Sequence, residues 1–202
     1  MLGTRNPTIF IHVYDYADVP KGTWTRAMRG ASEIFRRAGV ATKWGRCKAS
    51  GTGCVQGEPA ADFGEAPGLT LRILPRFTAY HSKFTEGATG FALVAAEAGN
   101  AAYAAVFYDR VALMVQQIGH SGEREEMLGE VLARVMAHEL GHLLLGSNSH
   151  SRSGIMRARW NWQDLRPLDA GRSHFTSAQA EIIRSQALAQ GEARASGEIA
   201  HR

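Results

Sequence analysis

Two histidines of the sequence stand four residues apart, and a glutamate directly follows the first of them: His138, Glu139 and His142. On a helix, residues four apart lie on the same face, so both imidazoles can reach one metal ion. Glu139 would then lie beside the ion, where a carboxylate can take a proton from a water molecule. The pattern predicts a catalytic zinc site that contains its own general base.

The third ligand of this site is predicted to be His150. A catalytic zinc ion usually has three protein ligands and one open position. Gly146 can adopt the left-handed conformation that ends a helix, and the polar residues 147–149 can form a turn that brings His150 back. Three acidic residues remain open as alternatives, although none has a matching local motif: Glu181, Asp164 and Asp169.

The segment 138–156 resembles the metzincin clan of zinc endopeptidases, whose pattern is H-E-x-x-H-x-x-G-x-x-H followed by a methionine turn. This chain has one additional residue before the glycine and one between the glycine and the last histidine, which implies a longer helix and a wider turn. The residues in the matching positions are His138, Glu139, His142, Gly146, His150 and Met156.

The resemblance implies an enzyme that hydrolyses peptide bonds with one Zn²⁺ ion and Glu139 as the general base. Some metzincins add a tyrosine after the methionine turn, but this chain has no tyrosine beyond Tyr108; Arg157 or Arg159 could assist instead. Two other functions stay open. One is a catalytically silent zinc-binding interaction module, and the other is a zinc hydrolase of a non-peptide amide.

The resemblance also implies that a peptide substrate lies extended along an edge strand. Residues 91–96 are the candidate strand, with Phe91, Ala92 and Leu93 at its start. The alternative is an ordinary hairpin strand without a role in binding.

Composition and charge limit the partners. The net charge of +4 is too small to indicate a nucleic-acid-binding surface, and no apolar stretch approaches the roughly 20 residues of a membrane span. The resemblance implies a peptide or protein substrate, and a monomeric state is expected. Basic residues follow the metal motif, either as solvated surface or as a cleft wall that prefers acidic groups: Arg152, Arg157, Arg159, Arg166 and Arg172.

Cys47 and Cys54 are the only cysteines, and their spacing favours a small disulfide hairpin. A disulfide indicates an oxidising compartment, so a secreted or periplasmic location is expected. No signal peptide is visible at the N-terminus, which leaves a cytoplasmic location as the alternative.

The elements that must position the site follow an α+β order. A strand near residues 9–14, a helix from Thr23 to about Ala38 and a strand over 40–46 predict a parallel βαβ unit. Further strands are expected at 69–73, 91–96 and 102–108, and helices at 121–145 and after the capping-box residues 176–179.

This order is similar to that of the metzincins, and the resemblance implies a metzincin-like twisted mixed β-sheet with two main helices, an active-site helix and a small C-terminal lobe with one helix. One catalytic domain is expected over residues 1–190, with an N-terminal lobe to about 146 and a C-terminal lobe over 147–190. Residues 191–202 are expected to form a flexible tail.

Overall fold

The computed structural model describes residues 6–47, 54–56, 68–76, 88–94, 102–118, 124–160 and 173–200. Their strands form one twisted, mixed sheet of six strands in the order β3-β2-β1-β4-β6-β5. The bounds of these strands are β1 Thr8–Asp15, β2 Ala41–Cys47, β3 Cys54–Gln56, β4 Leu69–Leu74, β5 Gly90–Leu93 and β6 Tyr103–Phe107. The four central strands are parallel, and the two edge strands, β3 and β5, pair antiparallel with their neighbours.

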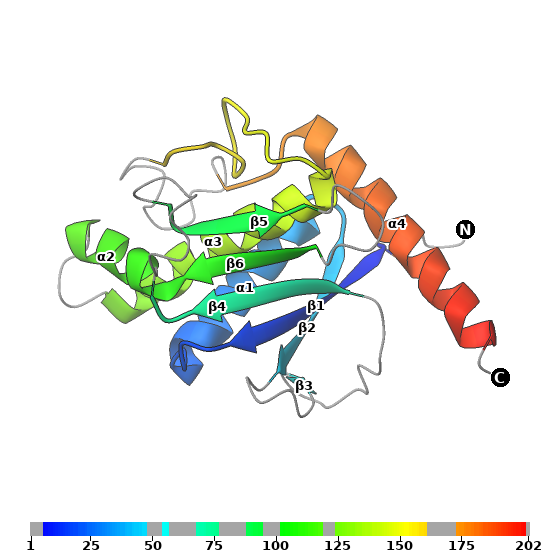
Figure 1. Ribbon diagram of the computed structural model, residues 1–202. Helices are drawn as coiled ribbons and strands as arrows, with labels where there is room; N and C mark the ends of the chain where they lie inside the picture. The colour runs from blue at the N-terminus through cyan, green and yellow to red at the C-terminus, as the bar shows by residue number, and fades with distance from the viewer. Residues whose placement is uncertain are drawn as a thin grey trace.

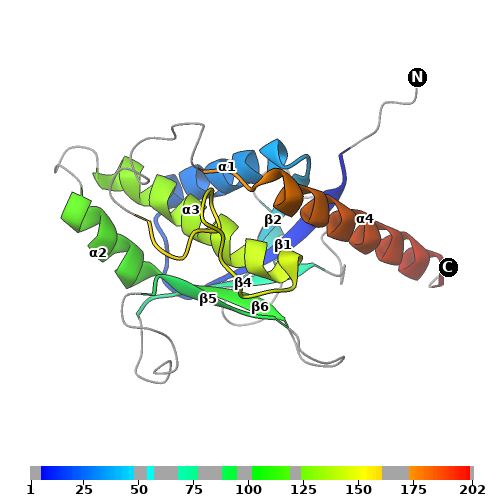
Figure 2. The same cartoon turned by 90° about the horizontal axis from the view of Figure 1, so that it is seen from above.

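The described residues also form four helices, α1 Lys21–Arg37, α2 Tyr108–Ile118, α3 Arg124–Leu145 and α4 Ser177–Ala200. Figures 1 and 2 show α1 and α3 side by side on one face of the sheet, with α4 beyond them near β1. The predicted mixed sheet and its covering helices are confirmed. None of the described helices is long and apolar enough to cross a bilayer.

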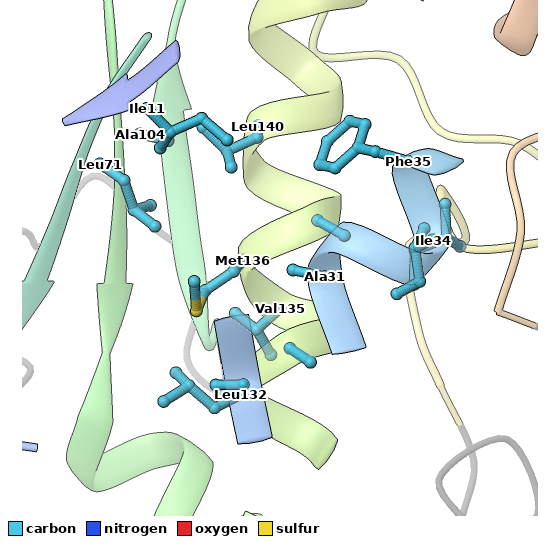
Figure 3. Packing of buried hydrophobic residues seen from close by; sticks show 14 of the residues in the cluster. Ile11, Ala31, Ile34, Phe35, Leu71, Ala104, Leu132, Val135, Met136 and Leu140 are labelled. Atoms are coloured by element: carbon cyan, nitrogen blue, oxygen red, sulfur yellow. The ribbon is translucent and has the colours of Figure 1, made fainter. Parts of the chain in front are cut away.

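The core lies between the sheet and the two helices that cover it. Strand residues alternate in burial because successive side chains of a strand point to opposite faces, as in β1. Figure 3 shows α3 between the sheet and α1. The labelled core residues, all of them fully or almost fully buried, are Ile11, Leu71 and Ala104 from the sheet, Leu132, Val135, Met136 and Leu140 from α3, and Ala31, Ile34 and Phe35 from α1.

Helix α3 is unusual because every residue from 131 to 142 is buried. A helix that is covered all round must have neighbours on each side. Its partners are α1, α2, α4 and the strands β4, β5 and β6. His138, Glu139 and His142 therefore lie on the most enclosed of the described helices, and the surrounding core limits their movement.

The sequence and the structure differ at three elements. Helix α2 was not expected; Val111 and Val115, which are four residues apart and buried, were the available signal. Strand β3 was not among the expected strands. Helix α4 continues through Gly191 to Ala200, where a tail was expected. Good helix formers surround this glycine, so its cost of about 1 kcal/mol does not end the helix.

Two sequence features that shape the fold are present as expected. Strands β1 and β2 pair in parallel across α1, as the predicted βαβ unit requires. Helix α4 begins with a capping box, in which the Thr176 amide donates to Gln179 Oε1 and the Gln179 amide donates to Thr176 Oγ1.

In the β2–β3 ladder Cys47 stands opposite Cys54, and Cys47 is disulfide-bonded.

Candidate metal centre

The last two turns of α3 place His138 and His142 on one face of the helix, as their spacing predicts. Only 8% of His138 and 4% of His142 is exposed. Their Nε2 atoms are 3.1 Å apart. Two zinc-bound nitrogens in tetrahedral geometry stand about 3.3 Å apart, given Zn–N bonds of about 2.05 Å. The two atoms therefore already have the separation that a shared ion requires.

Backbone carbonyls determine which nitrogen of each ring carries the proton. His138 Nδ1 lies 2.8 Å from the Ile155 carbonyl oxygen, and His142 Nδ1 lies 2.8 Å from the Ser147 carbonyl oxygen. A carbonyl oxygen can only accept, so both Nδ1 atoms must donate. Both Nε2 lone pairs then face each other at 3.1 Å, where neither can donate to the other. A cation bound between the two Nε2 atoms would relieve this repulsion.

Burial keeps both imidazoles in the form that binds metal. Desolvation lowers the pKa of His138 to about 4, although its hydrogen bond to the Ile155 carbonyl acts in the opposite direction. Desolvation also lowers the pKa of His142. At neutral pH both rings are therefore uncharged, which is the ligand form of histidine.

The third histidine arrives through the turn that ends α3. Gly146 has a left-handed φ of +61°, and residues 147–149 then form a polar turn in which the Ser149 amide donates to Ser147 Oγ. The exposed ring of His150 lies 5.3 Å from the His138 ring and 4.9 Å from the His142 ring, measured between centroids. One ligand atom from each of the three histidines lies within 4.8 Å of the others, so this group could hold a metal ion.

Glu139 is buried beside the histidines and against the edge strand. It is 5% exposed, and this desolvation raises the pKa of its carboxyl to about 8. Its side chain occupies the space over Gly90 of β5: a Cβ at position 90 would lie 2.8 Å from Glu139 Oε1 and 2.5 Å from the Ala105 carbonyl oxygen. A carboxyl group with a pKa near neutrality is suited to both accepting and donating a proton.

The role of Gly90 could not be found from the sequence, because the motif contains no information about which strand lies under Glu139. Trp160 was also missed. Its ring packs edge-on against the His138 ring, with 5.4 Å between centroids. The contacts of both residues join α3 to other segments of the chain, so they can be recognised only in the folded structure.

Residues 154–156 are buried in a turn beneath the histidines. Gly154 has a φ of +76°, and the Ser151 amide donates to the Met156 carbonyl oxygen over 2.8 Å. Met156 is fully buried, and its Sδ atom would lie 2.7 Å from a Cβ at Gly141. The glycine between the two histidines thus allows the methionine to pack directly against the helix.

The other candidate residues do not join this group. Among the described residues, Glu181 is exposed on α4 and is not part of any cluster that could hold a metal. Arg152 and Arg159 are exposed in the segment after α3, and Arg157 is partly buried. Asp164, Asp169, Arg166 and Arg172 lie outside the described residues.

The candidate substrate strand is at the edge of the sheet. β5 spans Gly90–Leu93 and pairs with β6 alone in the described sheet. Phe91 and Ala92 are buried, whereas Leu93 is 44% exposed. Figure 1 shows the segment that follows α3, in yellow, on the β5 side of the sheet. The histidine cluster and the edge strand therefore lie at the same side of the molecule.

Comparison with known proteins gives little further information. No family model and no curated protein matches the chain. Among solved structures, metalloproteinase-II from Bacteroides fragilis is similar, with a TM-score of 0.49 and 12% sequence identity. The match covers 90% of this chain and 53% of that protein, so the chain spans about half of its length. A likeness this weak carries no weight for function.

Proposed function

We propose that this protein is a zinc-dependent endopeptidase. The observation that carries the proposal is the pair of Nε2 atoms at 3.1 Å, with both Nδ1 atoms held by carbonyls and a buried carboxyl from the adjacent residue beside them. A structural site would not need Glu139, and it would tend to use four protein ligands. The proposed zinc ligands are His138, His142 and His150.

The proposed chemistry divides the work between the ion and the chain. When bound, zinc would polarise the scissile carbonyl and make water more acidic. Glu139 would accept the proton of the attacking water and pass it to the leaving nitrogen. The raised pKa of this carboxyl supports the second step, because a protonated Glu139 is stable in its buried site.

The proposed substrate is an extended peptide that lies along β5. β5 is an edge strand of the described sheet, and Gly90 brings its start next to Glu139. A peptide paired with β5 would gain main-chain hydrogen bonds and pass close to the carboxyl group. Phe91, Ala92 and Leu93 would supply this edge.

Membership of the metzincin clan is part of the same proposal. Met156 packs under the histidines, as the methionine of that clan's turn would, and Gly146 ends the helix with a left-handed residue. One catalytic domain over residues 1–190 remains a prediction. The disulfide at Cys47 supports the proposed secreted or periplasmic location.

Cleavage of a diverse peptide library tests the proposal. The wild type with zinc should release new N-termini, and the isosteric variant Glu139→Gln should lose at least about a hundredfold in rate while it still binds zinc. Zinc binding without cleavage of any peptide would favour a silent module or a hydrolase of other amides. An amide-substrate panel with the same variant separates these two outcomes.

The third ligand has its own test. Zinc affinity should fall strongly in His150→Ala, because an ion with two protein ligands is held weakly. Glu181→Ala is the matched control, since this residue is exposed and outside the cluster. An affinity that falls in Glu181→Ala and not in His150→Ala would reassign the ligand.

A further inference from the structure

Ile155 links the first histidine of the site to a segment far along the chain. Its carbonyl oxygen accepts a hydrogen bond from His138 Nδ1 over 2.8 Å, and its own amide donates one to the His174 carbonyl oxygen over 2.8 Å. Ile155 is 1% exposed, so water does not compete effectively with either hydrogen bond. The orientation of His138 therefore depends on the position of residues 173–176, which we call the strap.

The strap is tied back to the helix that carries His138. Arg134 lies one helical turn before His138, and its Nε donates to Ser173 Oγ over 2.9 Å. Arg134 is 2% exposed and Ser173 is 3% exposed. Burial of a guanidinium without hydrogen-bond acceptors costs free energy, so breaking this hydrogen bond is unfavourable. The path Arg134–Ser173–His174–Ile155–His138 begins and ends on α3.

Glycine and aromatic contacts hold the strap close to the metal helix. Any side chain at Gly154 would overlap the His174 carbonyl oxygen, so the absence of Cβ is what allows the approach. Phe175 packs on Phe35 of α1, with 5.3 Å between ring centroids. A Cβ at Gly141 would lie 2.8 Å from Phe175 Cε1, which places the strap directly beneath the turn between the two histidines.

We propose that Arg134 and Ser173 are positioning residues of the metal centre. They hold the strap so that the Ile155 carbonyl keeps His138 in the tautomer and ring orientation that present Nε2 to the ion. Partners of metal ligands act in this way, and their loss usually weakens metal binding by about 10- to 100-fold. The inference rests on the proposed function in one respect, namely that the histidines bind zinc.

The test compares Ser173→Ala with Ser32→Ala. Ser32 is a matched control because its Oγ also accepts side-chain hydrogen bonds, from Thr42 and Trp44, between α1 and β2. The measurements are the Kd for Zn²⁺ by competition with a chromophoric chelator, the visible spectrum of the Co²⁺-loaded protein, and the melting temperature without metal.

Both variants should lower the melting temperature of the metal-free protein. Only Ser173→Ala should weaken Zn²⁺ binding, by about tenfold, and shift the Co²⁺ bands. Wild-type affinity and an unchanged spectrum in folded Ser173→Ala would overturn the inference, as would equal losses in Ser32→Ala. Gly154→Ala displaces the strap without removing a polar group, so it serves as a second variant if Ser173→Ala is too unstable to purify. It should also weaken Zn²⁺ binding and shift the Co²⁺ bands. Wild-type Zn²⁺ affinity in Gly154→Ala would likewise overturn the positioning role.

The outcomes also separate this inference from the proposed activity. Zinc binding that depends on Ser173, without cleavage of any peptide, would keep the positioning role and remove the peptidase. Cleavage by a protein whose zinc affinity is insensitive to Ser173 and Gly154 would do the reverse. A wild type that binds neither Zn²⁺ nor Co²⁺ would overturn both.

Discussion

His138 and His142 occupy consecutive turns of one helix, yet their Nδ1 protons go to carbonyls of different origin. The partner of His142 is Ser147, five residues later, in the turn that ends α3. The partner of His138 is Ile155, 17 residues later, whose amide is held by His174 of the strap. The His142 contact can form as soon as the helix ends at Gly146. The His138 contact requires the C-terminal part of the chain to be in place.

Two similar ligands of one site therefore differ in how much of the fold supports them. A perturbation of the local turn should stay near His142 and His150, because the hydrogen bonds of this turn join residues within a short stretch of the chain. A perturbation of the turn at Gly154 or of the strap should reach His138 and the core together.

Zinc binding should produce the largest change in stability, and this change should depend equally on both histidines. Zinc at about a thousandfold excess over its Kd should stabilise the wild type by about 4 kcal/mol, which calorimetry with and without chelator measures. His138→Ala and His142→Ala should each lose this gain, since both rings are needed. A wild-type melting temperature that is the same with and without the chelator would contradict the proposed metal site.

Gly154→Ala should have the next largest effect. Alanine at a left-handed position costs about 1–2 kcal/mol, and here the new Cβ also overlaps the His174 carbonyl oxygen, so the total should reach about 3 kcal/mol. Gly39→Ala is the control: its φ of +80° gives similar strain, but its Cβ would meet the flexible Arg184 side chain. Chemical denaturation measures both, and equal losses would argue against the backbone clash.

Gly90→Ala should affect the role of Glu139 without affecting zinc binding by the two histidines. The added Cβ would lie 2.8 Å from Glu139 Oε1 and 2.5 Å from the Ala105 carbonyl oxygen, so the carboxyl and the start of β5 must both shift while the imidazoles keep their carbonyl partners. Displacement of a catalytic group by about 1 Å can cost a hundredfold in rate, so kcat/KM should fall by about that factor with zinc affinity retained. Gly191→Ala, where no atom lies within 4 Å of a new Cβ, is the control. Full activity in Gly90→Ala would exclude Glu139 as a tightly positioned base.

Gly146→Ala should have the smallest effect. Its φ is +61°, but nothing lies within 4 Å of a new Cβ, so only strain of about 1 kcal/mol is expected. Zinc affinity, measured by chelator competition, should change by less than about threefold. A loss as large as that of Gly154→Ala would break the comparison between the local and the distant contact.

Features encoded by short stretches could be predicted from the sequence. The helix around Ala31, Ile34 and Phe35 follows from their spacing, and all three are buried. The capping box at Thr176 and Gln179 also follows from local residue types. Helix α2 was missed because it begins at Tyr108, directly after the apolar strand β6, without a turn residue to mark the boundary.

The sequence alone determined the chemistry that is available: two imidazoles on one helical face, a carboxylate beside them, a glycine that can end the helix, and a third histidine after it. These relations span a few residues, and helix geometry converts their spacing into distance. Only the tertiary structure decided that Gly90 lies against Glu139, and that Arg134 and Ser173 connect α3 with the strap behind Ile155. Those contacts join segments far apart in the chain, and no local pattern specifies which of the possible neighbours will meet when the core packs.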